Sequence, residues 1–396
     1  MDIRTLDEFK VDGKTVLVRI DINSPVEDGK VLMSERIKEH AATIKELSEK
    51  GAKVVLMAHQ GRPGDEDFTT MEQHARLLTR SVGKEVKYVN DVCGETAQKT
   101  IKKLKKGQIL LLENVRMNED EMKDVTAEEH AKSSLVKNLA PLADLFVSDA
   151  FSVAHRAQAS VVGFAKVLPS AAGRIMEREL KSLEKAQKPE RPCIYILGGA
   201  KPKDSFKVMK YITKGGIADR VLTCGVIGNV FLLAKLGLGS TVGVDPNDPN
   251  ISKFFADATE LEKSGKVEVP VDVAIDDGGK RKEIPAAEIK AEDKAFDIGR
   301  GTVEKYKGII AGAKTIVMNG PPGKYEEKEF SYGTIEIMNA VTASRAFSLT
   351  GGGDTISAIG ALGANREGFS YISLGGHALL AYLTGEKLPG IEVLKR

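Results

Sequence analysis

The sequence predicts an α/β protein of two domains, each built on a doubly wound parallel β-sheet. Its 396 residues correspond to two domains at the usual size of roughly 100 to 200 residues each. Short runs of aliphatic and β-branched residues alternate with longer helical patterns along the whole chain. Because these runs are apolar throughout, they suit strands buried on both faces. Strands separated by helices form parallel βαβ units.

Eight such runs, each ending in a polar or glycine-containing loop, are expected to form strands. They cover 14–22, 53–59, 108–115, 144–151, 193–199, 220–225, 315–320 and 371–376. Ligands of such sheets bind beyond the carboxyl ends of the strands, so the residues that follow each run are the candidates for function.

A helix is expected over 171–187. Its apolar residues Met176, Leu180 and Leu183 are spaced i, i+4 and i+7, and Glu177 and Lys181 form an i, i+4 pair. It lies between two halves of different composition, so we interpret it as a connecting helix. Only nine of the 39 glycines lie in residues 1–170. We therefore expect side chains to hold a small anion in the first half, and backbone N–H groups to approach a polyphosphate in the second.

Composition excludes several classes of protein. Charged residues make up 29% and apolar residues 42% of the chain, which is typical of a soluble protein. The net charge is only +2, which is too small for the overall electric field of the protein to hold nucleic acid. Three cysteines without a CxxC pair indicate neither a disulfide framework nor a zinc site, and favour a reducing compartment.

No membrane segment is expected. The N-terminus lacks the apolar core of a signal peptide. The longest charge-free stretch, 368–385, contains Gly375, Gly376 and His377 in its middle, which favours a strand, a turn and a helix over a membrane span. We therefore expect a cytoplasmic protein with no nucleic-acid or membrane partner.

Two segments of the first half place polar side chains at strand ends. VRIDINSP puts Arg19, Asp21 and Asn23 on alternate positions of one strand, and AHQGRP offers His59 and Arg62 on a glycine-containing loop. The structural alternative for VRIDINSP is an ion pair with an Asx-Pro turn, and the structural alternative for AHQGRP is a solvated loop.

Three more arginines occupy comparable positions. Arg116 in LLENVRMN and Arg156 in DAFSVAHRAQAS follow apolar strands, and Arg36 in MSERIKEH begins a helix. Any one of them alone is more typical of a surface charge. Together they indicate a small, multiply charged anion, because guanidinium groups bind phosphate and carboxylate bidentately.

The second half contains several glycine turns. ILGGAKPKDS consists of a strand, the pair Gly198 and Gly199, and Lys201 at a new helix. GIIAGAKT is similar to a Walker A sequence, but Ala313 replaces its second glycine and it precedes a strand instead of following one. We interpret it as an ordinary helix-to-strand connection.

Two further turns are more specific. LTGGGDT supplies Gly352, Gly353, Asp354 and Thr355 before a helix, which suits phosphate and Mg²⁺. In SLGGHALLAYL another glycine turn opens a helix, whose N–H groups suit a phosphoryl group. Each turn alone is also compatible with a structural connection. Their coincidence with MNGPPGKYE favours nucleotide binding.

The segments VRIDINSP, AHQGRP, LLENVR, DAFSVAHRAQAS, LGGAK, NGPPGKYE and TGGGDT occur in this order over nearly the whole chain. As a set they resemble the phosphoglycerate kinase family. The resemblance implies two Rossmann-like domains joined by a hinge helix at 171–187. The first, 1–170 with the C-terminal tail 386–396 packed on it, would bind 3-phosphoglycerate. The second, 188–385, would bind MgATP or MgADP, and half-sites on separate domains imply a hinge closure.

The resemblance also implies roles for individual residues. It assigns 3-phosphoglycerate to Asp21, Asn23, Arg36, His59, Arg62, Arg116 and Arg156. It assigns the nucleotide to Gly198, Gly199, Lys201, Asn319, Glu326, Gly352, Gly353, Asp354 and Thr355, with Glu326 on the ribose and Asp354 on Mg²⁺. Arg36, Lys201 and the helix N-terminus at Gly375 and Gly376 would act on the transferring phosphoryl group.

Three positions depart from the better-known family pattern. Ser205 stands where many members have a second lysine, His377 stands where a third glycine is usual, and Met318 replaces a frequent tryptophan. These changes are more similar to the archaeal branch of the family.

The implied reaction is reversible phosphoryl transfer between ATP and the carboxylate of 3-phosphoglycerate, by a monomer acting on these two small molecules. A carboxylate with a pKa of roughly 3 to 4 is already ionised at neutral pH, so no general base is needed. Two alternatives stay open. A dinucleotide-dependent oxidoreductase would use the same architecture but lacks a correctly placed G-x-G-x-x-G. A non-catalytic nucleotide-binding relative is supported only by Ser205 and His377.

Overall fold

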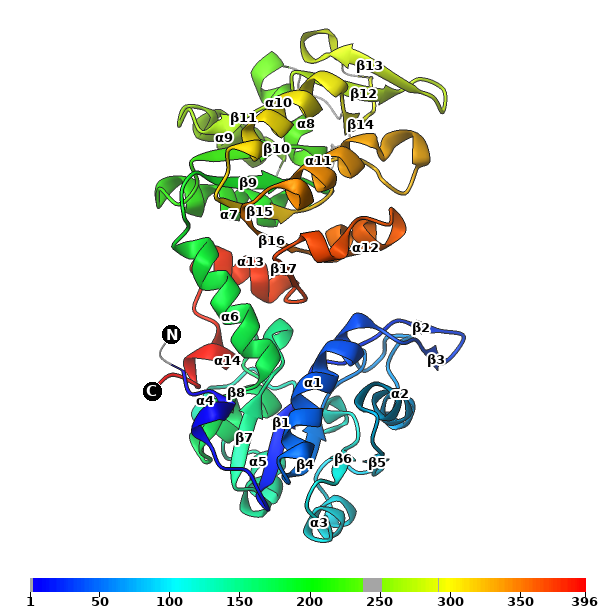
Figure 1. Ribbon diagram of the computed structural model, residues 1–396, viewed down its shortest axis with the longest axis vertical. Helices are drawn as coiled ribbons and strands as arrows, with labels where there is room; N and C mark the ends of the chain where they lie inside the picture. Colours follow the sequence, from blue (N-terminus) through cyan, green and yellow to red (C-terminus); the bar gives the residue numbers. More distant parts are fainter. Residues whose placement is uncertain (1–2, 238–250, 291) are drawn as a thin grey trace. The chain divides into compact units, whose positions relative to one another are not determined.

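The computed structural model describes residues 3–237, 251–290 and 292–396, which divide into two compact units (Figure 1). Unit 1 comprises residues 1–181 and 387–396, and unit 2 comprises residues 182–386. Each unit has helices packed on a six-stranded sheet, and all neighbouring strands of both sheets are parallel. The predicted α/β class with two parallel sheets is therefore confirmed.

The sheet of unit 1 has the order β5-β6-β4-β1-β7-β8. Its strands are β1 (Thr15–Arg19), β4 (Lys53–Met57), β5 (Val86–Tyr88), β6 (Ile109–Leu111), β7 (Leu145–Ser148) and β8 (Ser170–Ala172). β1 pairs with β4 on one side and with β7 on the other, so the order of strands reverses beside β1. The carboxyl ends around this reversal are where a doubly wound sheet forms its ligand crevice.

Helices cover both faces of this sheet. They are α1 (Glu35–Glu49), α2 (Glu72–Val82), α3 (Glu95–Lys102), α4 (Ala127–His130) and α5 (Ser134–Leu139), with the hairpin β2 (Val26–Glu27) and β3 (Lys30–Val31) beside them. Ile37 of α1 joins Val18 in one buried cluster, and Leu135 of α5 joins Leu17 in another. Successive strand residues point to opposite faces, so the uninterrupted apolar runs of the sequence supply both cores.

Unit 2 has a parallel sheet in the order β11-β10-β9-β15-β16-β17 and a three-stranded antiparallel sheet in the order β13-β12-β14. The parallel strands are β9 (Cys193–Leu197), β10 (Arg220–Thr223), β11 (Val267–Glu268), β15 (Thr315–Asn319), β16 (Phe347–Gly351) and β17 (Tyr371–Ser373). The antiparallel strands are β12 (Asp272–Asp276), β13 (Arg281–Pro285) and β14 (Ala295–Ile298). The strand order reverses between β9 and β15.

The helices of unit 2 also cover both faces of its parallel sheet. They are α7 (Pro202–Lys214), α8 (Gly225–Leu236), α9 (Ile251–Glu262), α10 (Arg300–Ala311), α11 (Tyr332–Ala343), α12 (Gly353–Ala361) and α13 (His377–Leu383). Phe206, Phe231 and Phe254 stack between α7, α8 and α9. GIIAGAKT connects α10 to β15, as expected, and the charge-free stretch 368–385 forms β17, a glycine turn and α13.

The helix expected over 171–187 is α6 (Arg174–Gln187). It begins three residues later than expected because Ser170–Ala172 pairs with β7 as the edge strand β8. Asp149 caps its first turn by accepting hydrogen bonds from the N–H groups of Ile175 at 2.8 Å and Met176 at 3.1 Å. The boundary between the two units, after Lys181, lies within this helix.

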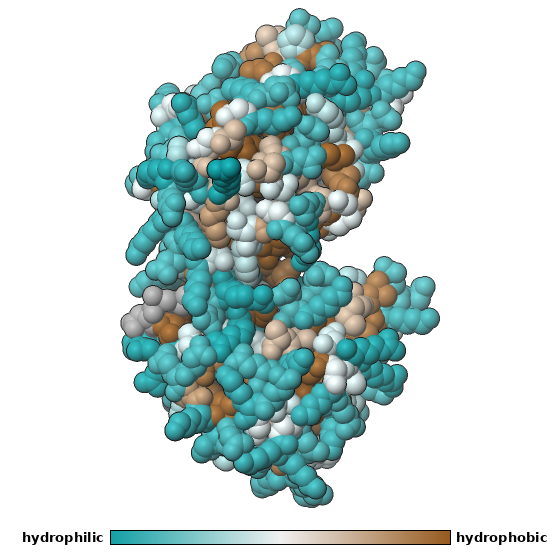
Figure 2. Space-filling model, viewed as in Figure 1, coloured by the Kyte–Doolittle hydropathy of each residue, from teal (hydrophilic) through white to brown (hydrophobic). Residues whose placement is uncertain are grey.

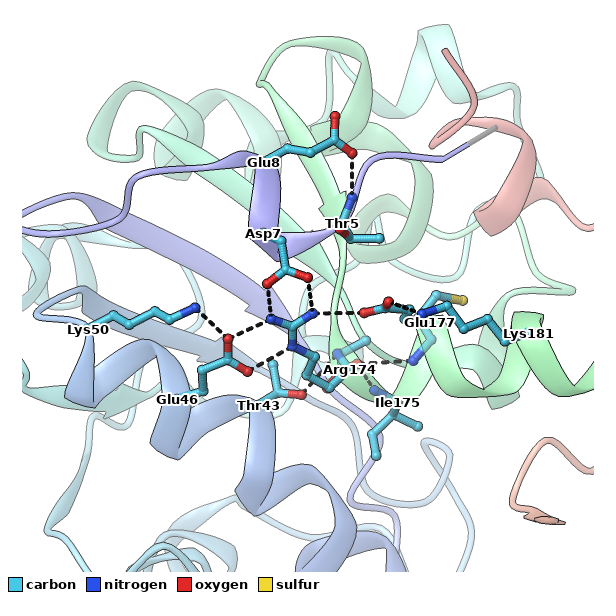
Figure 3. Close-up of polar contacts among 12 residues, drawn as sticks. Thr5, Asp7, Glu8, Thr43, Glu46, Lys50, Arg174, Ile175, Glu177 and Lys181 are labelled. Atoms are coloured by element: carbon cyan, nitrogen blue, oxygen red, sulfur yellow. Dashed lines mark hydrogen bonds and ion pairs between the residues drawn. The ribbon is translucent and has the colours of Figure 1, made fainter. Parts of the chain in front are cut away.

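Arg174 ties the start of α6 to two other elements of unit 1 (Figure 3). Its guanidinium lies 2.5 Å from Asp7 in the short helix η1 (Leu6–Glu8), 2.7 Å from Glu46 in α1 and 2.9 Å from Glu177. Glu46 in turn lies 2.7 Å from Lys50, so the cluster is a network and not an isolated pair.

The C-terminal residues belong to unit 1. In α14 (Pro389–Glu392), the N–H of Gly390 donates to the carbonyl of Ala154 at 2.8 Å, and Arg396 lies 2.7 Å from Glu8. On the face of the molecule that Figure 2 shows, hydrophilic residues predominate and apolar residues form small separate patches. In the described part of the chain, no helix is both long and apolar enough to cross a membrane.

Candidate functional site

The carboxyl ends of the strands in unit 1 bring together the polar residues predicted from the first half. Arg36, in the first turn of α1, forms an ion pair with Asp21, which follows β1. Ser34 caps this helix by accepting from the N–H of Ile37. The side chain of Asp21 is only 4% exposed, and it also accepts hydrogen bonds from the hydroxyl of Ser152 and the N–H of Asn23.

Gly61 joins the loops that follow β1, β4 and β6. Its N–H donates to Oδ1 of Asn23 at 2.8 Å, and its carbonyl accepts from the guanidinium of Arg116. The AHQGRP loop is therefore held from both sides. This leaves His59 buried and Arg62 exposed.

Charge accumulates around His59. Burial lowers its pKa well below the usual value, and the guanidinium groups of Arg19, Arg116, Arg156 and Arg36 lower it further. The imidazole is therefore neutral at physiological pH. Four cations close to one buried ring are unfavourable without a counter-charge, which makes this place suited to an anion.

The arginines perturb one another in the same way. Burial lowers the pKa of Arg116 to about 10, with further contributions from Arg156, Arg19 and Arg62. Burial, followed by the charge of Arg62, also lowers the pKa of Arg156. The Nε atom of Arg116 is buried without a hydrogen-bond partner among the described residues. An anion placed here would neutralise the repulsion and supply an acceptor.

Unit 2 contains a cavity of about 300 Å³ where its strand order reverses. It is lined by Gly198, Gly199, Ala200, Lys201, Asp204, Ser205, Asn319, Gly320, Gly352, Gly353, Asp354, Thr355, Gly376, His377 and Leu380. Most of the nucleotide-site residues predicted from separate motifs thus line one cavity. Glu326 and Gly375 are not among its lining residues.

The pair Gly198 and Gly199 lines the cavity and also contacts the loop after β15. The N–H of Gly198 donates to the carbonyl of Asn319, and the N–H of Gly199 donates to that of Pro321, both at 2.9 Å. A Cβ on Gly320 would lie 2.2 Å from the carbonyl oxygen of Gly198. These glycines allow two loops to touch through their backbones. The N–H groups of Gly198 and Gly199 are used in this contact.

The loop after β16 has two functions. Gly352, with φ of +93°, is the N-cap of α12, and Asp354 is exposed in the first turn. Thr355 is fully buried, and its hydroxyl accepts a hydrogen bond from the N–H of Gly320 at 2.8 Å. Thr355 also lines the cavity. Its side chain holds the NGPPG loop in place.

Asn319 contributes an unsatisfied donor to the same cavity. Its Nδ2 atom is buried and has no hydrogen-bond partner in the part of the chain that the structure describes. A buried N–H group without an acceptor costs free energy unless a ligand supplies one. Asn319 also lines the cavity, so a phosphate oxygen bound there would satisfy it.

Two predicted residues lie beside the cavity and not in its wall. Glu326 is exposed on the loop after β15, and its charge, with that of Asp354, contributes after burial to raising the pKa of Tyr325. Tyr325 therefore lies near both carboxylates. The N–H of Gly375 donates to the hydroxyl of Ser373 at 3.1 Å, which leaves Gly376 as the member of that turn that lines the cavity.

Sequence reasoning did not assign three of the participating residues. Asp204 and Ser205 line the cavity because they lie in the first turn of α7, directly after Lys201. Helical spacing from Lys201 is the signal that locates them. Ser152 binds Asp21 from a short turn after β7, where no periodic pattern points to it.

The cavity offers two carboxylates to a Mg²⁺ ion. Within the described ranges, no cluster of three or more acidic, histidine or cysteine side chains would hold a metal ion alone. Asp204 and Asp354 both line the cavity, however. Mg²⁺ is usually held by one or two carboxylates together with substrate phosphates, so this donor set fits the ion when a nucleotide is bound.

Comparisons with known proteins agree with this geometry. The family model described as phosphoglycerate kinase matches residues 6–386. A phosphoglycerate kinase of Methanothermobacter thermautotrophicus is 46% identical over 99% of this chain and 96% of its own length. One of Methanopyrus kandleri is 44% identical over 99% and 97%. The crystal structure of phosphoglycerate kinase from Pyrococcus horikoshii OT3 superimposes with a TM-score of 0.90 at 41% identity, covering 99% of this chain and 98% of that one. The chain belongs to the phosphoglycerate kinase family.

Proposed function

We propose that the chain transfers a phosphoryl group reversibly between ATP and the carboxylate of 3-phosphoglycerate, which yields ADP and 1,3-bisphosphoglycerate. As a member of this family the chain is a phosphotransferase of glycolysis. The observation that carries the proposal is the division of anion sites between the units. Unit 1 has an arginine cluster in which Nε of Arg116 is buried without a hydrogen-bond partner among the described residues, and unit 2 has a glycine-rich cavity lined by Lys201.

In unit 1, 3-phosphoglycerate binds among Asp21, Asn23, Arg36, His59, Arg62, Arg116 and Arg156. Four of these residues are arginines and His59 adds a neutral ring, which suits a ligand with a phosphate and a carboxylate. Asp21 acts mainly through Arg36, whose guanidinium it orients. Asn23 acts through Gly61, because its Oδ1 is already bound to the N–H of that residue.

In unit 2, the phosphates of the nucleotide lie in the cavity against Lys201, Gly352, Gly353 and the unsatisfied amide of Asn319. The N–H groups at the start of α12 provide the positive end of a helix dipole. Glu326, outside the cavity wall, accepts from the ribose hydroxyls.

Mg²⁺ would be held by Asp354 on one side, with Asp204 also within the cavity wall, and by the nucleotide phosphates. When bound, the ion withdraws negative charge from the phosphate oxygens. Gly198, Gly199 and Thr355 support this site by fixing the backbone of the neighbouring loop.

The chemistry needs charge neutralisation and not proton transfer. The acceptor carboxylate is already ionised at neutral pH, so no general base is required. Arg36 and Lys201, with the backbone at Gly376, reduce the repulsion between two anions and stabilise the charge on the transferring group. Transfer is direct, with no phosphoenzyme. We also propose that the protein acts as a monomer. We propose further that it acts in the cytoplasm, because its three cysteines are free and buried, which suits a reducing compartment.

The test is to incubate the protein with MgATP and 3-phosphoglycerate and to trap any acyl phosphate with hydroxylamine. Matched reactions contain each substrate alone. The proposal requires acyl phosphate only when both are present. Nucleotide binding without any product would contradict the proposal and favour a non-catalytic relative, and consumption of NAD would favour an oxidoreductase.

A further inference from the structure

Arg19 lies beneath the arginine cluster of unit 1 and is completely buried, so it has no surface with which to touch a ligand. Each of its three guanidinium nitrogens nevertheless has a hydrogen-bond partner. Nε donates to the hydroxyl of Ser160 at 2.7 Å, Nη1 donates to the carbonyl of Ile20, and Nη2 lies 3.1 Å from Nδ1 of His59. The last contact links a buried cation to a ring that the site uses.

The contact with Arg19 determines which nitrogen of His59 carries the proton. A guanidinium has only donors, so Nδ1 at 3.1 Å must accept the hydrogen bond through its lone pair. A proton on Nδ1 would instead place two N–H groups against each other. Because burial and the surrounding cations keep the ring neutral, its single proton resides on Nε2.

A second buried charge holds Arg19 in this orientation. Glu121 is fully buried and accepts two hydrogen bonds from Ser160, from its N–H at 2.8 Å and from its hydroxyl at 2.7 Å. The same hydroxyl accepts from Nε of Arg19. Burial raises the pKa of Glu121, and the charge of Arg19 is the largest factor that opposes this rise. A series of hydrogen bonds therefore runs from Glu121 through Ser160 and Arg19 to His59.

We propose that Arg19 is a positioning residue that fixes His59 as the Nε2–H tautomer, so that the site offers the acceptor substrate a neutral N–H donor. The role of this donor rests on the proposed function. Nε2 donates to no protein group within the described ranges. The opposite tautomer would present a lone pair to a phosphate or carboxylate, which repels it.

His40 of the same unit provides an internal control, because its hydrogen bonds require the opposite tautomer. Its Nε2 accepts from the N–H of Asp21 at 3.2 Å, and its Nδ1 lies 3.3 Å from the carboxylate of Asp149. Nε2 is thus the acceptor and Nδ1 carries the proton. Both rings are buried in unit 1, yet their hydrogen bonds require different tautomers.

The first experiment measures both tautomers by ¹⁵N-edited NMR of the histidine rings in the full-length, ligand-free protein at neutral pH. Signals are assigned with His59→Gln and His40→Gln. We expect the Nε2–H form for His59 and the Nδ1–H form for His40. A Nδ1–H tautomer or an imidazolium at His59 overturns the proposal, and this outcome needs no variant of Arg19.

Adding 3-phosphoglycerate then tests the donor. We expect the Nε2–H resonance of His59 to shift and the Nδ1–H resonance of His40 to stay in place. If His59 does not respond although acyl phosphate is still formed, the donor role is overturned while the proposed function stands. If neither a response nor acyl phosphate is seen, both fail.

Kinetics separate positioning from general stability. Arg19→Met is combined with Glu121→Gln so that no buried charge loses its partner. We expect KM for 3-phosphoglycerate to rise about tenfold, which is the loss of one hydrogen bond to an ion, with KM for ATP unchanged. In the His59→Gln background the same pair of substitutions should add little. The proposal is overturned if KM for 3-phosphoglycerate rises equally in the wild-type and His59→Gln backgrounds, or if KM for ATP rises as much as KM for 3-phosphoglycerate.

Discussion

Replacing Arg174 with Gln removes the cation at the centre of the network that holds the start of α6 (Figure 3). Three carboxylates lose their shared partner, and two of them, on Glu46 and Glu177, are mostly buried, with side chains 25% and 11% exposed. Hydrogen bonds from Arg174, with a smaller contribution from Lys50, lower the pKa of Glu46 from 4.5 to about 2.

That decrease corresponds to about 3 kcal/mol of stabilisation at neutral pH. Lys50 supplies part of it, and Arg174 is 23% exposed, so solvent screens the interaction. We therefore expect Arg174→Gln to lower the free energy of unfolding of unit 1 by about 2 kcal/mol. The matched control is Arg178→Gln on the same helix. Arg178 pairs with Glu39 at 2.6 Å, but the two side chains are 48% and 37% exposed. This change should cost well below about 1 kcal/mol.

The assay is urea unfolding followed by far-ultraviolet circular dichroism, with hydrogen exchange to localise the loss to α1 and η1. The folded-state pKa of Glu46 is depressed, so its contribution is complete above its unfolded pKa and disappears as the pH falls towards about 2. At about pH 3 the difference between wild type and Arg174→Gln should be less than half its value at neutral pH. Equal stabilities of Arg174→Gln and Arg178→Gln, or a difference independent of pH, would refute this reasoning.

Four further substitutions test the site and the loops that support it. Arg36→Ala should reduce turnover by about 100-fold or more while MgADP still binds, because it removes a charge that stabilises the transition state; near-normal turnover would exclude the assigned role. Asp354→Asn should raise the Mg²⁺ concentration needed for half-maximal rate by about tenfold, and an unchanged Mg²⁺ dependence would place the ion elsewhere. Gly198→Ala should destabilise unit 2 by about 1 to 3 kcal/mol, because its Cβ would lie 2.6 Å from the carbonyl oxygen of Pro321. Gly353→Ala, with open space around its Cβ, should keep stability and weaken only nucleotide binding; equal melting temperatures of the two glycine variants would contradict this account.

Much of the fold was predictable because burial leaves a local signal. Every expected apolar run contains a strand of one of the two parallel sheets, with shorter bounds than expected. The strand β16 was not separated from the glycine motif that follows it, since FSLTG runs directly into the loop. The edge strands β8 and β11 are only three and two residues long, too short for a periodic pattern.

The site was predictable in its residue types but not in all their roles. Alternation along the first strand places Arg19 on the same side of the strand as Asp21. It does not indicate how deeply a side chain is buried, and Arg19 is completely buried beneath the site. The N–H groups of Gly198 and Gly199 are used by a loop more than 100 residues later in the chain, a contact without local signature. The contact of Glu121 with Ser160 was likewise not predictable, because Glu121 lies on an irregular segment where no periodic pattern marks a buried residue.

The most direct test of the division between the two anion sites is a crossed calorimetric titration. 3-Phosphoglycerate and MgADP are each titrated into the wild type, Arg156→Met and Lys201→Met. A lost charge-assisted hydrogen bond corresponds to about a tenfold or greater loss of affinity. We predict that Arg156→Met weakens only 3-phosphoglycerate and that Lys201→Met weakens only MgADP. A variant that weakens both ligands equally, or the wrong one, would contradict the account.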